Sequence, residues 1–420
     1  MNDGTFMNIL LVSAGPCCPP TAGNRIRILN LMVRLARRHC ITFICCATDP
    51  GEAAETRSCL GDHGIETILV TDPRPPKHGP LFYARLAANL LSSLPYSVRR
   101  YESAKLRQTI EEQASRRPIH LCQVEWFPYA RDLRRLTGIP TVVVAHDVVS
   151  MLWQRHYNAE RQPLKRWYIR QQWRKFERFE REVYADADRV VAVSPEDARI
   201  LSERMGVAAV DVVDNGVDKD YFAAVSGQRE PGRILFLGTL ESRPNLDAVR
   251  QMLDRVFPAV LAQEPSARLC IVGRNPPDWL RRRVLDCNGV ELHGSVADVR
   301  PFMGQSGVMA VPLRIGGGSR IKILEALSAG LPVVSTRIGV EGLSLTPGEH
   351  LDVVEDCTAL AGALVKVIRN PERACHMAER GRHVVRKRYD WDVLADKLEQ
   401  SWQETLRHWV PGDKKSELTG

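Results

Sequence analysis

The sequence predicts an α/β protein built from two Rossmann-like, doubly wound parallel-sheet domains that face each other across a cleft. Its 420 residues exceed the length at which one hydrophobic core keeps growing, so two domains are expected. Short apolar runs of strand length alternate with amphipathic stretches of helical length along the chain. Because strands that read as continuous apolar runs are buried on both faces, this alternation indicates parallel sheets covered by helices.

The first series of elements begins with a buried strand, "NILLVSA" at 8–14, and a helix that presents Ile28, Leu31, Met32 and Leu35 on one face. A long basic helix precedes the sixth strand of this series. The remaining strands are predicted at 40–47, 65–70, 120–125, 140–146, 189–194 and 211–216.

A polar break, "AVSGQREPGR" at 224–233, resembles a linker, and the alternation then restarts. The second series is predicted to hold strands at 233–239, 267–273, 290–294, 307–313 and 332–336, with a helix from Val249 to Leu261. The predicted organisation is an N-terminal Rossmann-like domain at 1–224, a second Rossmann-like domain at 225–390, a helix at 391–410 that returns to the first domain, and a flexible tail at 411–420. Ligands of such sheets bind beyond the carboxyl ends of the strands.

Cysteine usage and the N-terminus favour a cytoplasmic protein. The eleven cysteines are an odd number and none has CxxC spacing, which argues against a disulfide framework or a zinc site. The chain starts without a basic leader, and its first apolar run is too short to span a bilayer, so a signal peptide is not expected.

The net charge of +8 is concentrated in the first half of the chain. Residues 1–210 contain 30 Lys and Arg against 22 Asp and Glu, whereas residues 211–420 contain 28 of each kind. In the segment 155–181, nine bases face three acids, a composition that suits anionic lipid headgroups, nucleic acid or a solvated helix. Ile169, Trp173, Phe176 and Val183 fall near one helical face, so these side chains also fit a core-facing stripe.

The segment "RIGGGSRIKILEALSAG" at 314–330 is the main candidate for a ligand site. Its glycines permit close approach to the backbone, and a helix starting near Ser319 would present free N–H groups and a partial positive charge to phosphate. Arg320 and Lys322 add cationic donors, while Glu325 lies on the same side of the helix as Lys322 and is suited to accept hydrogen bonds from ribose hydroxyls. The alternative is an ordinary helix in which Glu325 pairs with Lys322.

This segment, extended to 336, resembles the donor-binding segment of the family-four retaining glycosyltransferases, which have the GT-B fold. The resemblance is closest to the branch that builds bacterial exopolysaccharide, capsule and related lipid-linked glycans. Supporting segments in the same order lie at 19–39, 141–150, 187–194, 212–222, 236–249, 269–273 and 292–303.

The resemblance assigns donor-binding roles in the second domain. Glu325 matches the second Glu of the family's Glu-x7-Glu motif, but the first Glu falls at Gly317, so backbone amides of Gly317, Gly318 and Ser319 are expected to take over part of its work. Thr239 and Asn245 occupy the positions where many members carry an Arg and a Lys, so the cationic clamp is expected at Arg320 and Lys322. The other residues assigned to the donor site are Gly238, Thr239, Arg243, Gly273, Arg274, His293, Ser295 and Val296.

In the first domain the resemblance places Gly23, Asn24 and Arg25 on the phosphate and acceptor side, and His146 at the sugar subsite. On the residues alone, Arg25 also fits an exposed helical base, and a lone histidine at a strand end is more often structural. The catalytic candidates are His146, Arg320 and Lys322.

No metal or other cofactor is assigned. Three D-x-D tripeptides, at 186–188, 218–220 and 390–392, sit at predicted turns or boundaries, where Asp is favoured for capping.

The resemblance implies metal-independent transfer of a sugar from a nucleotide-sugar donor to a glycan or lipid-linked acceptor with retention of configuration. A cytoplasmic enzyme of bacterial surface polysaccharide biosynthesis is expected, with the basic domain in peripheral contact with an anionic membrane. The alternatives are a nucleotide-sugar epimerase or a phosphorylase on the same fold, and, less favoured, a basic nucleic-acid-binding protein; nucleic acid is not an expected partner.

Overall fold

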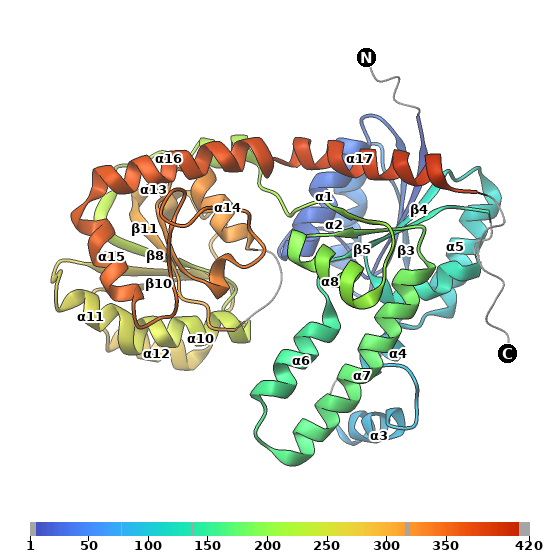
Figure 1. Cartoon of the computed structure of the whole chain (residues 1–420), viewed down its shortest axis with the longest axis horizontal. Helices are drawn as coiled ribbons and strands as arrows, with labels where there is room; N and C mark the ends of the chain where they lie inside the picture. The colour runs from blue at the N-terminus through green and yellow to red at the C-terminus, as the bar shows by residue number, and fades with distance from the viewer. Residues whose placement is uncertain (1–5, 77, 136–137, 316–319, 411–420) are drawn as a thin grey trace. The chain divides into compact units, whose positions relative to one another are not determined.

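The computed structural model describes residues 6–410 apart from 77, 136–137 and 316–319, and it consists of two compact α/β units (Figure 1). Unit 1 comprises Met1–Asp214 together with Leu394–Gly420, and unit 2 comprises Asn215–Val393. Each unit contains one sheet, and the described pairings between neighbouring strands are all parallel. The predicted fold class of two parallel-sheet α/β domains is therefore confirmed.

Unit 1 is built on a seven-stranded sheet of order β3-β2-β1-β4-β5-β6-β7. The direction of winding reverses between β1 and β4, which pair in register from Ile9 with Leu121 to Val12 with Val124. A polar or catalytic side chain at the carboxyl ends of these two strands therefore lies at a topological switch point. The strands are β1 Asn8–Ser13, β2 Cys40–Cys46, β3 Glu66–Val70, β4 Leu121–Val124, β5 Thr141–Ala145, β6 Arg189–Ala192 and β7 Val210–Val212.

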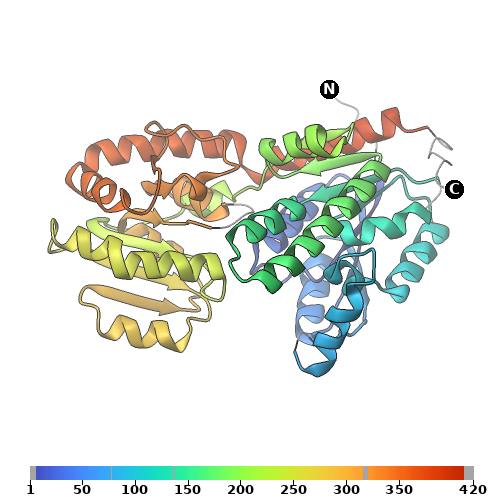
Figure 2. The ribbon, with the colours of Figure 1, turned by 60° about the horizontal axis from the view of Figure 1, so that its bottom comes forward.

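The helices of unit 1 cover this sheet and include a protruding pair, α6 and α7 (Figure 1), which run antiparallel side by side (Figure 2). Helix α1 buries Ile28, Leu31, Met32 and Leu35, as its periodicity predicts. Helix α2 begins after Asp49, whose carboxylate accepts from the Glu52 amide and so satisfies one of the unpaired N–H groups. The helices are α1 Gly23–Leu35, α2 Pro50–Gly61, α3 Pro80–Asn89, α4 Tyr96–Tyr101, α5 Ala104–Arg116, the 3₁₀ helix η1 Phe127–Arg135, α6 Val149–Ala159, α7 Pro163–Asp186 and α8 Pro195–Met205.

Unit 2 is built on a six-stranded sheet of order β10-β9-β8-β11-β12-β13, and its switch point lies between β8 and β11. The carboxyl ends of these strands lead into the loops that carry the predicted donor residues. The last strand, β13, was not predicted, because three residues give too short an apolar run. The strands are β8 Glu230–Leu237, β9 Arg268–Gly273, β10 Val290–Gly294, β11 Ser306–Val311, β12 Val333–Thr336 and β13 Asp352–Val354.

The helix predicted from Val249 to Leu261 is not continuous in the structure. It consists of α10 Arg243–Gln251, a π segment η2 Met252–Val256, and α11 Phe257–Leu261. The Phe257 amide donates to the Met252 carbonyl, five residues back, and the next residue, Pro258, has no amide hydrogen to continue the α-helical pattern. The other helices of unit 2 are α9 Lys219–Ala223, α12 Asp278–Leu285, α13 Arg300–Gln305, α14 Ile321–Ser328, the 3₁₀ helix η3 Ile338–Val340, α15 Leu360–Arg369 and α16 Pro371–Arg388.

The final helix, α17 Trp391–His408, belongs from Leu394 onward to unit 1. Its Trp402 is fully buried there, and its indole Nε1 donates to Gln123 Oε1 on β4 at 2.6 Å. Among the residues that the structure describes, no helix combines the length and apolar character needed to cross a membrane.

Candidate active site

The first residue of interest at the switch point of unit 2 is Lys322, in the first turn of α14. Its ammonium group donates to the Leu237 carbonyl at 2.9 Å and to Asn245 Oδ1 at 3.0 Å, so it bridges α14 to the end of β8 and to α10. Burial, with a smaller contribution from the charge of Arg320, lowers the pKa of Lys322 to about 8. The amine is therefore held inside the site and still carries a proton at neutral pH.

Glu325 lies almost one turn further along α14, and its side chain is half-buried. No described residue donates a hydrogen bond to its carboxylate or forms an ion pair with it. Lys322 instead donates to Leu237 and Asn245, so the alternative Glu325–Lys322 pair is not formed among the described contacts. Burial raises the pKa of Glu325 to about 7, although the nearby charge of Lys322 opposes the shift. A partly desolvated acid without a donor among the described residues is suited to accept hydrogen bonds from a ligand.

Arg320 is the residue immediately before α14, which starts at Ile321. Its buried guanidinium donates through Nε and Nη2 to the Ile338 carbonyl, at 3.3 and 3.0 Å, and Nη2 lies 4.0 Å from Glu341. The structure therefore directs this side chain toward η3. Gly317, Gly318 and Ser319 fall outside the described residues, and so do the amides to which phosphate binding was assigned.

Gly238 and Gly273 bring the ends of β8 and β9 into close contact. A Cβ on Gly273 would lie 2.0 Å from the Gly238 carbonyl oxygen, and a Cβ on Gly238 would lie 2.8 Å from the Asn245 side chain. Asn245 Nδ2 also donates to the Thr239 carbonyl at 3.0 Å. Asn245 thus links the β8 loop, α10 and Lys322. The sequence does not reveal this role, because it shows only that Asn245 stands where many family members have a lysine.

The remaining donor candidates lie on the same edge of the sheet, at the ends of β9 and β10. Ser295 and Asn275 adopt φ angles of 54° and 51°, which are uncommon for residues with a side chain. The Ser295 amide donates to the Gly273 carbonyl at 3.2 Å, and the Asn275 amide donates to Ser295 Oγ at 3.5 Å. Such backbone conformations are frequent at binding sites. Asn275 was not predicted, and the positive φ that singles it out is not visible in a sequence.

The other four predicted donor residues are distributed around these loops. The His293 ring packs 4.7 Å from Phe302, and its Nε2 lies 3.4 Å from Glu291. Val296 packs against the core of unit 2, Arg274 follows β9, and Arg243 is exposed at the first position of α10.

Unit 1 contains a chain of hydrogen bonds that ends at His146, the residue after β5. His146 Nε2 lies 2.9 Å from Glu125 Oε2, Gln123 Nε2 donates to the other oxygen of Glu125, and Trp402 donates to Gln123 at 2.6 Å. Glu125 follows β4 and is buried. Burial by itself would raise the pKa of Glu125, but the hydrogen bond and charge of His146, together with Arg27, hold it below its usual value. Glu125 is therefore a carboxylate that positions His146.

Arg27, on α1, is fully buried beside this network and was not predicted. Its Nη1 donates to the Asp214 carbonyl at 2.6 Å. Burial lowers the pKa of Arg27, opposed by the charges of Glu125 and Asp214. The apolar neighbours of this arginine in α1 give a weak signal in the sequence, since a base on the buried face of a helix requires a partner.

The three residues predicted on the phosphate and acceptor side lie at the start of α1. Gly23 is its first residue, and Asn24 is exposed. Arg25 forms a bidentate pair with Glu52 of α2, through distances of 2.9 and 3.0 Å, so this base is already engaged within unit 1.

One group of metal-ligating side chains occurs among the described residues: Cys270, Glu291 and His293, whose ligand atoms lie within 4.8 Å of one another. Arg233 Nη2 donates to Glu291 at 2.7 Å, so a guanidinium already neutralises this carboxylate. We assign no metal to the group.

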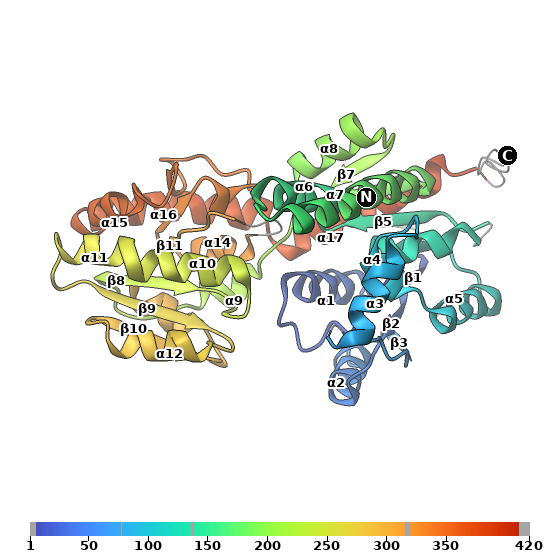
Figure 3. The same ribbon diagram turned by 90° about the horizontal axis from the view of Figure 1, so that it is seen from below.

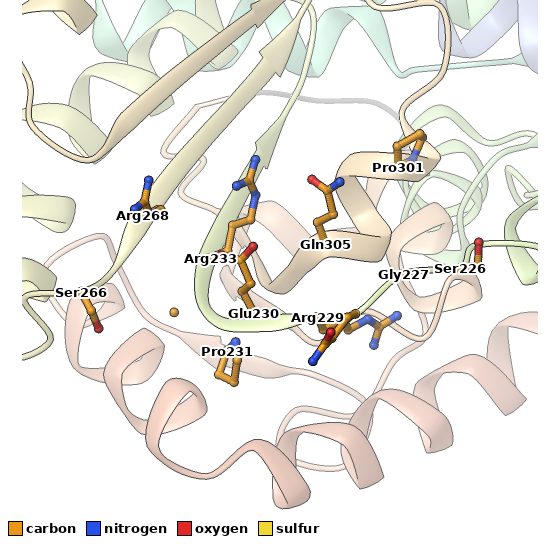
Figure 4. Close-up of a pocket in the computed structure, with 12 residues that line it drawn as sticks. Ser226, Gly227, Arg229, Glu230, Pro231, Arg233, Ser266, Arg268, Pro301 and Gln305 are labelled. Atoms are coloured by element: carbon orange, nitrogen blue, oxygen red, sulfur yellow. The ribbon is translucent and has the colours of Figure 1, made fainter.

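A cavity of about 890 Å³ lies at the other end of the strands of this sheet, near the amino end of β8 (Figure 4). Two of its arginines are held by protein groups: Arg229 donates to the Ala329 and Gly330 carbonyls at the end of α14, and Arg233 pairs with Glu291. Its position, away from the carboxyl ends of the strands, separates it from the residues described above.

Two family models match consecutive parts of the chain. A model described as "Glycosyltransferase Family 4" matches residues 23–221, and one described as "Glycosyl transferases group 1" matches residues 231–370.

The matches to curated relatives cover about half of the chain. A phosphatidyl-myo-inositol mannosyltransferase of Mycobacterium leprae is 33% identical over 222 residues, which cover 50% of this chain and 57% of the relative. The corresponding mannosyltransferase of Mycolicibacterium smegmatis is 31% identical over 218 residues, which cover 50% and 55%. The chain thus spans about half the length of the curated relatives it matches.

Solved structures resemble the fold over nearly the whole chain. HepE of Anabaena in complex with UDP aligns with a TM-score of 0.67 at 16% identity, covering 95% of this chain and 100% of that structure. Sucrose-phosphate synthase of Thermosynechococcus elongatus aligns with a TM-score of 0.67 at 18% identity, covering 96% and 100%. At these identities the likeness concerns the fold alone.

Proposed function

We propose that this chain, which belongs to the family-four glycosyltransferases with the GT-B fold, transfers a sugar from a nucleotide-sugar donor to a glycan or lipid-linked acceptor. The observation that carries the proposal is the carboxylate of Glu325. It lies beside the switch point of unit 2, its pKa is raised to about 7, and it has no donor among the described residues. Paired hydroxyls, such as those of a ribose, would supply the missing hydrogen bonds.

The diphosphate of the donor is proposed to bind near the start of α14. Lys322 supplies a positive charge there, Arg320 adds a second one behind it, and the helix N-terminus favours anions. Stabilising the negative charge that develops on a leaving group often accelerates a reaction more than any other single effect. The charged side chains and the helix would serve this purpose without a metal ion.

Transfer is proposed to proceed with retention of configuration, in which the acceptor hydroxyl attacks from the side that the diphosphate leaves. His146, oriented by Glu125, is proposed to line the sugar subsite of unit 1, and Gly23, Asn24 and Arg25 its phosphate and acceptor side. Characterisation of the product anomer by NMR would test retention, and activity that persists in excess EDTA would support a metal-independent reaction.

The biological setting that we propose is the synthesis of bacterial surface polysaccharide by a cytoplasmic enzyme in peripheral contact with the membrane. The sequence resemblance supports this setting, and so does the excess of bases in the first half of the chain. The names of the matched mannosyltransferases indicate phosphatidylinositol-based acceptors for those proteins, which favours a lipid-linked acceptor here as well.

Titration calorimetry with UDP and with GDP tests the proposed nucleotide site. Glu325→Gln should weaken binding of the preferred nucleotide by about 1.5–3 kcal/mol, or roughly 10- to 150-fold, because charge-assisted hydrogen bonds to the hydroxyls are lost. Glu372→Gln, an exposed acid at the start of α16, is the control and should bind like the wild type. Unchanged affinity in the Glu325 variant would refute the assignment.

A further inference from the structure

Two neighbouring parts of unit 1 expose large apolar side chains. Helix α3 exposes Leu81 and Tyr83, and Leu91, two residues beyond its end, is 95% exposed. In the first two turns of α7, Leu164 is 84% exposed and Trp167 is half exposed. Scattered exposed apolar residues are normal, but a contiguous set indicates an interaction surface.

The start of α7, next to these apolar residues, is strongly basic. The segment 161–176 contains six bases and no acid. Lys165, Arg166 and Arg170 are exposed and project from the same two turns as Leu164 and Trp167. Acids appear on α7 only from Glu177 onward, so the positive charge belongs to the end of the helix that protrudes.

Hydrogen bonds fix α3 beside α7. Gln172 Nε2 on α7 donates to Asn89 Oδ1 at the end of α3, at 3.1 Å, and Lys175 donates to the Asn89 carbonyl at 2.6 Å. Figure 3 shows α3 next to the α6–α7 pair, on the same side of unit 1. Exposed apolar groups thus occur on two neighbouring elements, and together with the bases of α7 we call them the α3–α7 face: Leu81, Tyr83, Leu91, Leu164, Trp167, Lys165, Arg166 and Arg170.

We propose that the α3–α7 face docks on an anionic lipid bilayer, with its leucines entering the headgroup boundary and its bases contacting lipid phosphates. Leucines beside amphipathic aromatic rings, flanked by lysine and arginine with long apolar stems, make up the composition of interfacial membrane-binding helices. The same region holds a cavity of about 490 Å³ lined by Trp153, His156, Leu164, Lys165, Tyr168 and Ile169, which offers apolar space at the tip.

Charge favours a bilayer over the other occupants of this face. A second copy of the chain would place two sets of uncompensated bases against each other, which costs free energy. Nucleic acid would neutralise the bases but would leave Leu81, Leu91 and Leu164 without apolar partners. An anionic membrane satisfies both kinds of side chain, because phosphates lie directly above hydrocarbon.

This inference deepens the proposed function by naming the surface that would contact the membrane. It rests on that function, because docking would bring the enzyme to a lipid-linked acceptor. Binding of the full chain to vesicles is measured without donor or acceptor, so its failure would leave nucleotide binding untouched. Conversely, a Glu325 variant with unchanged nucleotide affinity would not alter the vesicle result. The two proposals are therefore tested separately.

The experiment is flotation with vesicles of phosphatidylcholine alone and of phosphatidylcholine with phosphatidylglycerol, at low and at high salt. We expect binding to the anionic vesicles that weakens at high salt, because exposed charges are screened. Lys165→Glu/Arg166→Glu should reduce the partition coefficient by roughly tenfold or more, since each base contributes about fivefold near an anionic surface. Leu164→Ser should reduce binding severalfold.

Matched controls come from unit 2. Arg386→Glu/Lys387→Glu reverses a basic pair on α16, and Leu285→Ser replaces a leucine that is 85% exposed on α12; both variants should bind as the wild type does. No binding of the wild type to anionic vesicles, or equal losses in the test and control variants, would overturn the proposal. Dimers in sedimentation velocity that Leu164→Ser dissociates, without vesicle binding, would assign the face to a second copy and likewise overturn it.

Discussion

At the residue scale, burial is the main cause of the pKa shifts of both Glu325 and Lys322, and the two shifts have opposite directions. Burial disfavours the charged form of each, so the pKa of Glu325 rises to about 7 and that of Lys322 falls to about 8. Each shift is a cost to the unliganded fold, because the native state holds a charge that is better solvated when the chain unfolds. A ligand that brings hydroxyls and phosphates would relieve both costs.

The shift of Glu325 predicts how stability depends on pH. Between about pH 4.5 and 7 the native carboxyl binds more protons than the unfolded one, so its ionisation lowers the free energy of unfolding as pH rises. Glu325→Gln should therefore unfold like the wild type near pH 4 and be more stable above pH 7, by on the order of 1–3 kcal/mol. Urea denaturation across this range checks the prediction; a variant that is less stable at pH 8 would contradict it.

Glu125 shows the opposite behaviour, because its partners outweigh burial. Its pKa is held below the usual value, so it contributes stability above about pH 4.5 that is lost as pH falls further. Glu125→Gln should lower the free energy of unfolding at neutral pH by roughly 3–5 kcal/mol, since Arg27 then remains buried beside a neutral group. Chemical denaturation measures this loss.

Glu52→Gln is the control, because it removes the partly exposed partner of Arg25 and should lower the free energy of unfolding by at most about 1 kcal/mol. Equal losses in the two variants would count against a special role for the buried network.

At the scale of elements, the ends of β8 and β9 meet only because Gly273 has no side chain. Gly273→Ala would place a methyl group 2.0 Å from the Gly238 carbonyl oxygen, and backbone must then move. We expect a loss of about 1–3 kcal/mol or more in the free energy of unfolding, together with weaker nucleotide binding, because the β8 loop carries Thr239 and contacts Asn245.

Gly362→Ala is the matched control for this prediction. A Cβ at Gly362, on α15, has no atom within 4 Å, so alanine should stabilise the helix by up to about 1 kcal/mol. A Gly273 variant that unfolds at the same denaturant concentration as the wild type would show that the two strand ends are less closely packed than the structure indicates.

At the scale of the whole molecule, the last helix completes a unit that begins at the N-terminus. Trp402 is hydrogen-bonded to Gln123, 279 residues away in the sequence. His39 Nε2 of unit 1 lies 3.1 Å from Glu399 Oε1 of the last helix. Unit 1 therefore includes buried residues that follow unit 2 in the sequence. The network from Trp402 to His146 also ties this helix to the proposed sugar subsite.

Trp402→Ala tests this dependence. The substitution should destabilise unit 1 by roughly 3–5 kcal/mol, because it removes a large buried ring and leaves Gln123 without its donor. Hydrogen exchange of peptides from β4, followed by mass spectrometry, localises the effect and should show faster exchange. Trp167→Ala, at a half-exposed position of the same unit, should leave that exchange unchanged; equal protection in both variants would argue that α17 is not part of the core.

Local sequence patterns were enough to predict the main strands, their parallel arrangement and the position of the glycine-rich segment at a strand end. A buried strand between two helices reads as an apolar run, so these features are visible without coordinates. Glu325 and Lys322 could be named as candidates for the same reason, because their spacing on a helix is fixed by geometry. The short strand β13 and the π segment before Pro258 were missed, because neither leaves a periodic signal.

The pairing of charges, in contrast, became visible only in the folded chain. The fold directs Arg320 to the Ile338 carbonyl, leaves Glu325 without a described donor, and joins His146 to Glu125. It also separates the aromatic residues of the basic helix, since Phe176 is buried in the core whereas Trp167 is exposed. The physical reason is that hydrogen-bond partners and burial are set by residues distant in the sequence, and a local pattern contains no information about them.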